Sequence, residues 1–294
     1  MRSVSRYVSG DREAPRARWA RAATVAAAAL VSIGTGQVSR AAVSPNWSAS
    51  PNWSGYAATN PDGATVSFST VTGTWKVPVA TCRSKDAGAA STVWVGLGGY
   101  TGGSRTEQTG TDSSCDAKRK PRYWAWFELA PYPANSIPNL VEPGDRITGT
   151  VTILKQGFGV VQMQVQNRTR GWTVTRKLSS SQPDTSSAEW IVSSVATCAR
   201  FGECAQASLA NFGRAGMTEI SAVGNSRRGN LASAAWKIIP LHLVPGTLTV
   251  PTLNPDGAAT RSRAVSPAGA SPGPVAKGGG AFKVKWVAVA TRGV

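Results

Sequence analysis

The chain has 294 residues, and its 32 Lys and Arg residues outnumber its 15 Asp and Glu residues, for a net charge of +17. Its apolar content of 41% is ordinary for a globular protein, so a sizeable core can form. The positive residues are scattered in short runs such as 118–120, and no motif that reads RNA or DNA accompanies them. We therefore expect a cationic, solvated surface and no nucleic-acid partner.

The N-terminal segment has the pattern of an export signal. Three arginines precede an apolar run, 22–33, that is too short to span a bilayer comfortably. Small residues then offer a cleavage site after Ala41 or Ala42. We expect residues 1–42 to be a signal peptide and 43–51 a short N-terminal segment or pro-segment. The mature protein is then secreted, without stable membrane association.

Four cysteines fit an exported, oxidised protein with two disulfides. Cys198 and Cys204 are near each other in the sequence and could clamp a loop, in which case Cys82 and Cys115 would form the other bridge. None of the four is in a C-x-x-C pair, so a zinc site is not expected.

From Tyr56 to Val250 the chain is a series of short β-type segments between clusters of Gly, Pro, Asn, Asp and Ser. Several alternate between apolar and polar residues, and no stretch shows a long 3.6-residue period. This pattern indicates an all-β fold, an antiparallel sandwich or barrel. The predicted strands are 65–71, 73–77, 92–97, 122–129, 146–154, 160–166, 172–178, 189–193, 218–223, 236–243 and 247–250.

Residues 254–280 are rich in Pro, Gly, Ala and Ser, a composition typical of a flexible loop or linker. A further predicted strand, 281–289, follows them and cannot fold by itself. We expect this strand to return to the main sheet. Residues 52–294 would then form one domain, with 254–280 as a long flexible surface loop.

The sequence offers little for nucleophilic or metal-dependent catalysis. His242 is the single histidine, no G-x-S-x-G elbow is present, and the cysteines are better used as disulfides. A histidine-based metal site needs more than one His, so we expect His242 to be structural. The glycines of 96–99 are not followed by a helix and are weak evidence for nucleotide binding.

Carboxylates remain as candidates for chemistry. Glu189 lies in a predicted strand, 187–192, and Glu128 shares a strand face with Trp124 and Trp126. A partly dry aromatic groove favours the protonated form of a carboxyl group, which suits acid–base chemistry at acidic pH. Two carboxylates in one groove would also suit glycoside hydrolysis. A non-catalytic sandwich that binds glycans or cell wall through its 11 Trp residues is a further alternative.

Six short segments stand in a fixed order and spacing between residues 52 and 192. They are Asn-Trp-Ser-Gly-Tyr at 52–56, Gly-Thr-Trp-Lys-Val-Pro at 73–78, Trp-Val-Gly-Leu at 94–97, Gln-Thr-Gly at 108–110, Tyr-Trp-Ala-Trp-Phe-Glu at 123–128 and Ala-Glu-Trp-Ile-Val at 188–192. In this set the chain resembles the glutamic peptidases (eqolisins), which are secreted acid endopeptidases.

The resemblance implies two packed antiparallel sheets, a sandwich of concanavalin-like or jelly-roll type, with the active site on a concave face. It implies a catalytic dyad of Gln108 and Glu189, although by its neighbours alone Gln108 would be a polar residue at a turn. Trp53, Trp94 and Glu128 match cleft residues and are expected to bind substrate. The resemblance implies protein or peptide substrates and requires no metal or cofactor. A monomer is expected.

The chain departs from the family pattern at two positions. Gly98 stands where the fungal members carry an acidic residue, and Ser193 replaces the acidic residue that follows the Glu-bearing strand. The chain is also strongly basic, whereas the fungal members are rich in acidic residues. These departures concern subsite preference and pH optimum more than the reaction itself.

Overall fold

The computed structural model describes residues 47–83, 86–101, 105–154, 159–198, 204–244, 246–253, 259–266 and 268–288. They belong to one compact unit, Ser44–Val294. The second unit, Met1–Val43, contains the predicted signal peptide and lies outside the described residues. Within the described ranges, no helix is long and apolar enough to cross a bilayer.

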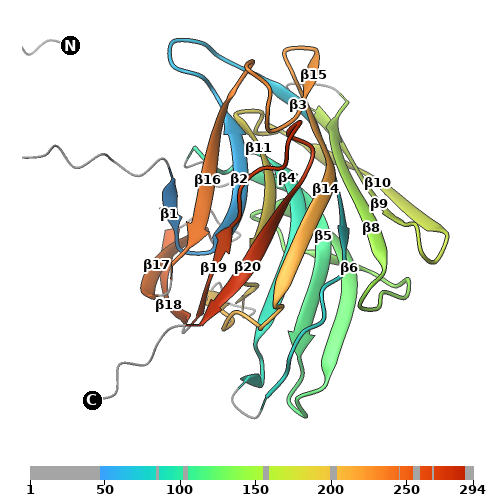
Figure 1. Ribbon diagram of the computed structural model, residues 1–294, viewed down its shortest axis with the longest axis vertical. Helices are drawn as coiled ribbons and strands as arrows, with labels where there is room; N and C mark the ends of the chain where they lie inside the picture. Colours follow the sequence, from blue (N-terminus) through green and yellow to red (C-terminus); the bar gives the residue numbers. More distant parts are fainter. Residues whose placement is uncertain are drawn as a thin grey trace, which may run out of the picture. The chain divides into compact units, whose positions relative to one another are not determined.

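The described residues form β-strands and no α-helix (Figure 1). The strands are β1 (Ser48–Ser50), β2 (Trp53–Thr59), β3 (Phe68–Lys76), β4 (Ala90–Leu97), β5 (Thr106–Cys115), β6 (Pro121–Ala130), β7 (Asn135–Ile137), β8 (Arg146–Ile153), β9 (Gly159–Asn167), β10 (Trp172–Ser180), β11 (Ser187–Ser193), β12 (Ala196–Cys198), β13 (Cys204–Gln206), β14 (Arg214–Gly224), β15 (Arg227–Gly229), β16 (Lys237–Leu243), β17 (Gly246–Leu253), β18 (Ala259–Ser266), β19 (Ala268–Pro272) and β20 (Phe282–Ala288).

Most of these strands belong to one continuous sheet, in the order β10-β9-β8-β3-β14-β20-β19-β16-β2-β11-β4-β5-β6-β7. Strands β3, β8 and β9 pack against β4 and β5, so the sheet folds back on itself into two layers (Figure 1). The layers join through β19 and β16, at the pair Leu243 and Ala270. Among the described residues, the strands pair antiparallel except β1 with β16, which are parallel. The predicted all-β sandwich is confirmed, with the difference that both layers belong to one sheet.

Large apolar side chains fill the space between the two layers. Trp75 of β3 and Trp190 of β11 are almost fully buried there, and their indole N–H groups donate to Thr111 Oγ1 and Thr72 O, each at 2.8 Å. A Cβ atom on Gly73 would lie 3.0 Å from Trp190 Cδ1, so the glycine makes room for this ring. In place of the two predicted strands 65–71 and 73–77, the structure has one strand, β3, which runs from Phe68 to Lys76 through Gly73.

The C-terminal region differs from the sequence prediction. Strands β17 and β18 pair over eight residues, from Gly246 with Ser266 to Leu253 with Ala259, and β19 follows. The flexible loop expected at 254–280 thus contains two strands, β18 and β19, which pair through the main chain with β17 and β20. The last strand, β20, pairs with β14 and β19, so the predicted return to the main sheet is confirmed.

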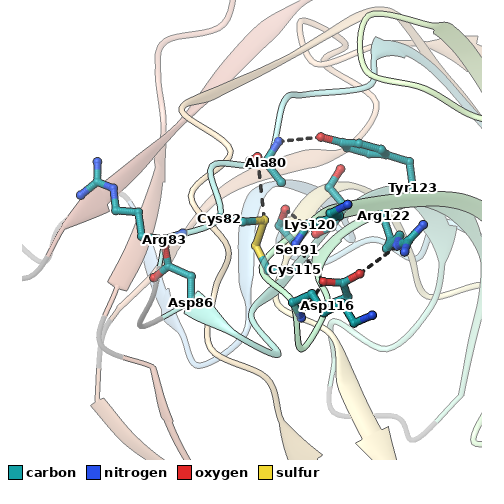
Figure 2. Close-up of a disulfide and its surroundings, with 12 residues drawn as sticks. Ala80, Cys82, Arg83, Asp86, Ser91, Cys115, Asp116, Lys120, Arg122 and Tyr123 are labelled. Carbon is teal, nitrogen blue, oxygen red and sulfur yellow. Dashed lines mark hydrogen bonds and ion pairs between the residues drawn. A yellow bond between two sulfur atoms is a disulfide. The ribbon is translucent and has the colours of Figure 1, made fainter.

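A disulfide between Cys82 and Cys115 ties the segment after β3 to the end of β5 (Figure 2). Its S–S distance is 2.01 Å, and this predicted bridge is confirmed. Nearby, the Asp116 carboxylate accepts a hydrogen bond from Arg122 Nε at 3.0 Å. The β12–β13 register pairs Cys198 with Cys204, but the side chains of both lie outside the described residues, so their bridge stays a prediction.

Candidate active site

The predicted dyad and Glu128 lie side by side across four adjacent strands, β11, β4, β5 and β6, in an arrangement called the row below. The register pairs Glu189 of β11 with Gly96 of β4, Gly96 with Gln108 of β5, and Gln108 with Glu128 of β6. Directly paired residues point to the same face of a sheet, so these three polar side chains share a face. Neighbouring strands lie about 4.8 Å apart, which puts the Glu189 and Gln108 backbones roughly 10 Å apart.

Gly96 lies between the two predicted catalytic residues and keeps their surroundings free of a further side chain. A Cβ atom at this position would lie 2.8 Å from Trp94 Cζ3 and 3.1 Å from Gln108 Cβ. The edge of the Trp94 ring therefore lies over Gly96, between the strands of Glu189 and Gln108. Any larger residue at position 96 would displace this ring.

The Glu189 side chain is fully buried, and neither carboxylate oxygen has a hydrogen-bond partner among the described residues. Burial raises the pKa of Glu189 well above its ordinary value, the nearby Ser187 hydroxyl lowers it, and the negative charges of Asp184 and Glu107 raise it further. Such a carboxyl group keeps hydrogen-bonding capacity that no described residue uses, and a strongly shifted pKa of this kind marks a candidate for proton exchange.

Gln108 and Glu128 form a direct hydrogen bond, in which Gln108 Nε2 donates to Glu128 Oε2 at 2.8 Å. Burial raises the pKa of Glu128 to about 7; the bond from Gln108 lowers it and the charge of Asp112 raises it. This contact fixes the orientation of the Gln108 amide. One N–H group and the carbonyl oxygen of the amide remain for other partners.

Aromatic side chains surround this row on the same face. The rings of Trp53 and Trp94 meet edge to face, with 5.1 Å between their centroids, and Trp94 Nε1 donates to Ser193 Oγ at 3.0 Å. Both belong to an apolar cluster separate from the core between the layers. The other members of this cluster and the residues packed against it are Ala57, Trp126, Ile191, Leu241, Tyr100, Trp124 and Ile239.

The structure thus brings Trp53, Trp94, Gln108, Glu128 and Glu189 together on one face of the sheet. His242 makes other contacts: its Nδ1 lies 3.1 Å from Ser271 Oγ, and its ring lies 4.7 Å from that of Trp47.

Sequence reasoning missed Asp112, which lies on the same face of β5 as Gln108. Asp112 is 5% exposed, and its carboxylate accepts a hydrogen bond from Trp126 Nε1 at 2.6 Å. Burial raises the pKa of Asp112 to about 7, against the hydrogen bonds from Thr92 and Trp126. The alternation Gln108, Gly110, Asp112 would have revealed it, had this segment been recognised as a strand.

The buried carboxyl groups predict a fold that is more stable in acid than at neutral pH. Burial raises the pKa of Glu107 to about 8, and the pKa values of Asp112, Glu128 and Glu189 are raised as well. The folded protein therefore holds more protons than the unfolded chain between about pH 4 and pH 8. The free energy of unfolding is greatest near pH 4 and decreases as pH rises to about 8.

Thermal unfolding followed by circular dichroism from pH 4 to pH 8 measures this dependence. For Glu107 alone, the rise from 4.5 to about 8 corresponds to a loss of up to about 5 kcal/mol. Glu107→Gln should make the decrease shallower, whereas Asp62→Asn, at a side chain 95% exposed, should leave it unchanged. A melting temperature that rises from pH 4 to pH 8 would contradict the prediction.

The chain matches the model of the Peptidase A4 family over residues 51–242. Its fold is similar to that of scytalido-glutamic peptidase, solved with a peptide-based transition-state analogue, with a TM-score of 0.58 and 21% identity over 81% of this chain and 98% of that one. It is also similar to SCP-B, an eqolisin solved with the tripeptide Ala-Ile-His, with a TM-score of 0.55, 21% identity and the same coverage. No curated protein sequence matches the chain significantly. Since the family match spans more than half of its length, the chain belongs to the Peptidase A4 family and is a glutamic endopeptidase.

Proposed function

We propose that this peptidase is secreted, acts in acid, and hydrolyses peptide bonds with Glu189 and Gln108 as its catalytic pair. The observation that carries the proposal is the row in which Gly96 alone separates the two residues across the sheet. The carboxylate oxygens of Glu189 have no hydrogen-bond partner among the described residues, and the orientation of the Gln108 amide is fixed by Glu128.

In the proposed reaction, ionised Glu189 accepts a proton from a water molecule, whose oxygen attacks the carbonyl carbon of the scissile bond. The carbonyl oxygen becomes negatively charged, and the N–H of Gln108 that Glu128 does not occupy donates to it. The Gln108 carbonyl oxygen orients the attacking water. Protonated Glu189 then gives its proton to the leaving nitrogen as the C–N bond breaks, which restores the carboxylate.

The surrounding residues support substrate binding in this proposal. The half-buried Trp53 ring borders the row and offers apolar surface to substrate side chains, and the buried Trp94 ring packs against it. The raised pKa of Glu189 moves the pH at which it ionises upward from that of an ordinary glutamate, so the acidic limb of the pH–activity profile should lie above about pH 4.5.

Secretion and a monomeric state also stay proposals. The export-type N-terminal segment supports secretion, and a disulfide between Cys82 and Cys115 suits an oxidising compartment. Peptides and proteins are the substrates that peptidase family membership implies.

Gln108→Ala is expected to lower kcat for cleavage of a denatured protein at acidic pH by about 10²–10³-fold, because it removes the donor to the oxyanion. Initial rates against a fluorogenic peptide and mass spectrometry of the products measure this loss. Gln164→Ala is the matched control, since Gln164 lies on β9 and its Nε2 donates to the Thr175 hydroxyl. An active Gln108→Ala enzyme within threefold of wild type would refute the proposed pair.

A further inference from the structure

Two segments far apart in the sequence meet just before the strands of Glu189 and Gln108. Residues 182–186 lead into β11, and residues 98–101 and 105 belong to the connection from β4 to β5. The contacts between them are called the clasp below. Three of its hydrogen bonds join Arg105 Nη1 to Gln182 Oε1 at 2.8 Å, Thr101 Oγ1 to Ser186 Oγ at 2.9 Å, and Gly98 N to Ser187 O at 3.1 Å.

Asp184 is the centre of the clasp. Its Oδ2 accepts a hydrogen bond from Gly99 N at 3.0 Å, and its Oδ1 accepts one from Ser186 N at 2.9 Å. Its own main-chain N–H donates to Glu107 Oε2 at 3.2 Å. One residue thus contacts the β4–β5 connection, the strand β5 and the turn into β11.

The absence of a side chain at Gly98 makes room for Asp184. Gly98 has φ +81°, and a Cβ atom there would lie 2.3 Å from Asp184 Cβ. Gly98 stands where the fungal members carry an acidic residue. In this chain the Asp184 carboxylate, which comes from another segment, lies beside that position.

Glu107 completes the clasp from the opposite face of β5. It is 2% exposed, it neighbours Gln108 in the sequence, and the proposed reaction makes no use of it. We propose that Asp184 and Glu107 are positioning residues, which fasten the segment leading into the Glu189 strand to the strand that carries Gln108. The inference rests on the proposed catalytic pair.

The charges around Glu189 give the clasp an electrostatic effect as well. Asp184 and Glu107 are the two neighbours whose negative charges raise the pKa of Glu189. Glu128 lies beyond Gln108, and Arg105 acts on Glu107, whose pKa it lowers.

The elements beside β11 contribute no opposing charge within the row. Strand β4 presents Gly96, β2 presents Ala57, and β16 presents Ile239 next to Ala57. Removing the charge of Asp184 therefore lowers the pKa of Glu189, and the acidic limb of the activity profile moves to lower pH. Glu107, whose own pKa is raised to about 8, is protonated in the acidic range and contributes little charge there.

Three variants test the clasp, with kcat, KM, the pH profile of kcat/KM and the melting temperature measured for each. Asp184→Ala removes both side-chain hydrogen bonds and should lower kcat 10–100-fold with KM changed less than threefold, because a small misplacement of reacting groups is costly. Asp184→Asn keeps an acceptor oxygen and should lose less. Glu107→Gln keeps the acceptor for Asp184 N and should hold kcat within threefold. Both Asp184 variants should move the acidic limb to lower pH, whereas Glu107→Gln should leave it in place.

Thr101→Val is the matched control, because it removes one uncharged bond of the same clasp. It should leave the acidic limb in place. If the clasp is purely structural, activity falls only in proportion to the folded fraction, and the acidic limb of the kcat/KM profile stays in place in every variant. This result would overturn the inference. Should Asp184→Ala fail to fold, the acidic limb of Asp184→Asn decides. Wild-type activity in Glu189→Gln would instead refute the proposed pair, independently of the clasp.

Discussion

Glu189→Gln should abolish peptide hydrolysis, with a fall in kcat of at least about 10³-fold at every pH. The amide keeps the shape of the side chain but can neither take a proton from water nor return one to the leaving nitrogen. Because the side chain is fully buried, solvent cannot substitute for it at the reacting carbonyl. The measurement is the initial rate of peptide cleavage from pH 3 to pH 8, with product masses recorded.

Glu189→Gln should lower activity without lowering the stability of the fold. The folded protein no longer has to bury an ionised carboxylate without a hydrogen-bond partner, so its melting temperature at pH 7 should not fall below that of wild type. Glu142→Gln is the control, because Glu142 pairs with Arg170 at an exposed site and should leave kcat unchanged. Residual cleavage above a hundredth of the wild-type rate would show that Glu189 is not the general base.

Gly55→Ala should destabilise the protein by at least about 4 kcal/mol, enough to prevent accumulation of folded protein. Gly55 pairs with Ile191 between β2 and β11 and has φ +148°. A Cβ atom there would lie 2.1 Å from the main-chain oxygen of Trp190, which cannot move without separating the two strands. The yield of soluble protein and urea unfolding measure the effect.

Gly63→Ala is the control that distinguishes the steric clash at Gly55 from the cost of backbone strain alone. Gly63 also has a positive φ, +77°, but an added Cβ would meet nothing within 4 Å. Its substitution should therefore cost only about 1 kcal/mol, through the backbone alone. Equal losses at Gly55 and Gly63 would mean that the contact with Trp190 is not the cause.

The strand of Glu189 could be predicted from sequence, whereas that of Gln108 could not. Residues 187–192 alternate with an aromatic and two β-branched residues, which is a strong local signal. Strand β5 runs Thr-Glu-Gln-Thr-Gly-Thr-Asp-Ser-Ser-Cys and has no aliphatic or aromatic residue. Its strand geometry comes from pairing with β4 and β6, so Gln108, taken by its neighbours alone, was interpreted as a turn residue.

The residues of the clasp lay beyond sequence reasoning for a related reason. Glu107 would be an ordinary surface glutamate by its neighbours, but in the fold it is 2% exposed and accepts a hydrogen bond from Asp184 N, a residue far from it in the sequence. The strands β18 and β19 also escape sequence prediction, because Pro, Ala and Ser carry little strand signal and these strands form through pairing with β17 and β20.

The row from Glu189 to Glu128 has a consequence for when activity begins. Strand β11 pairs on both sides with strands from the first third of the chain, β2 and β4, so Glu189 cannot reach the row until these distant segments have met. Pairing of this kind is slow compared with local structure. Under the proposed catalytic pair, a chain in which β2, β4 and β11 have not yet paired has no assembled row and cannot digest itself or its neighbours.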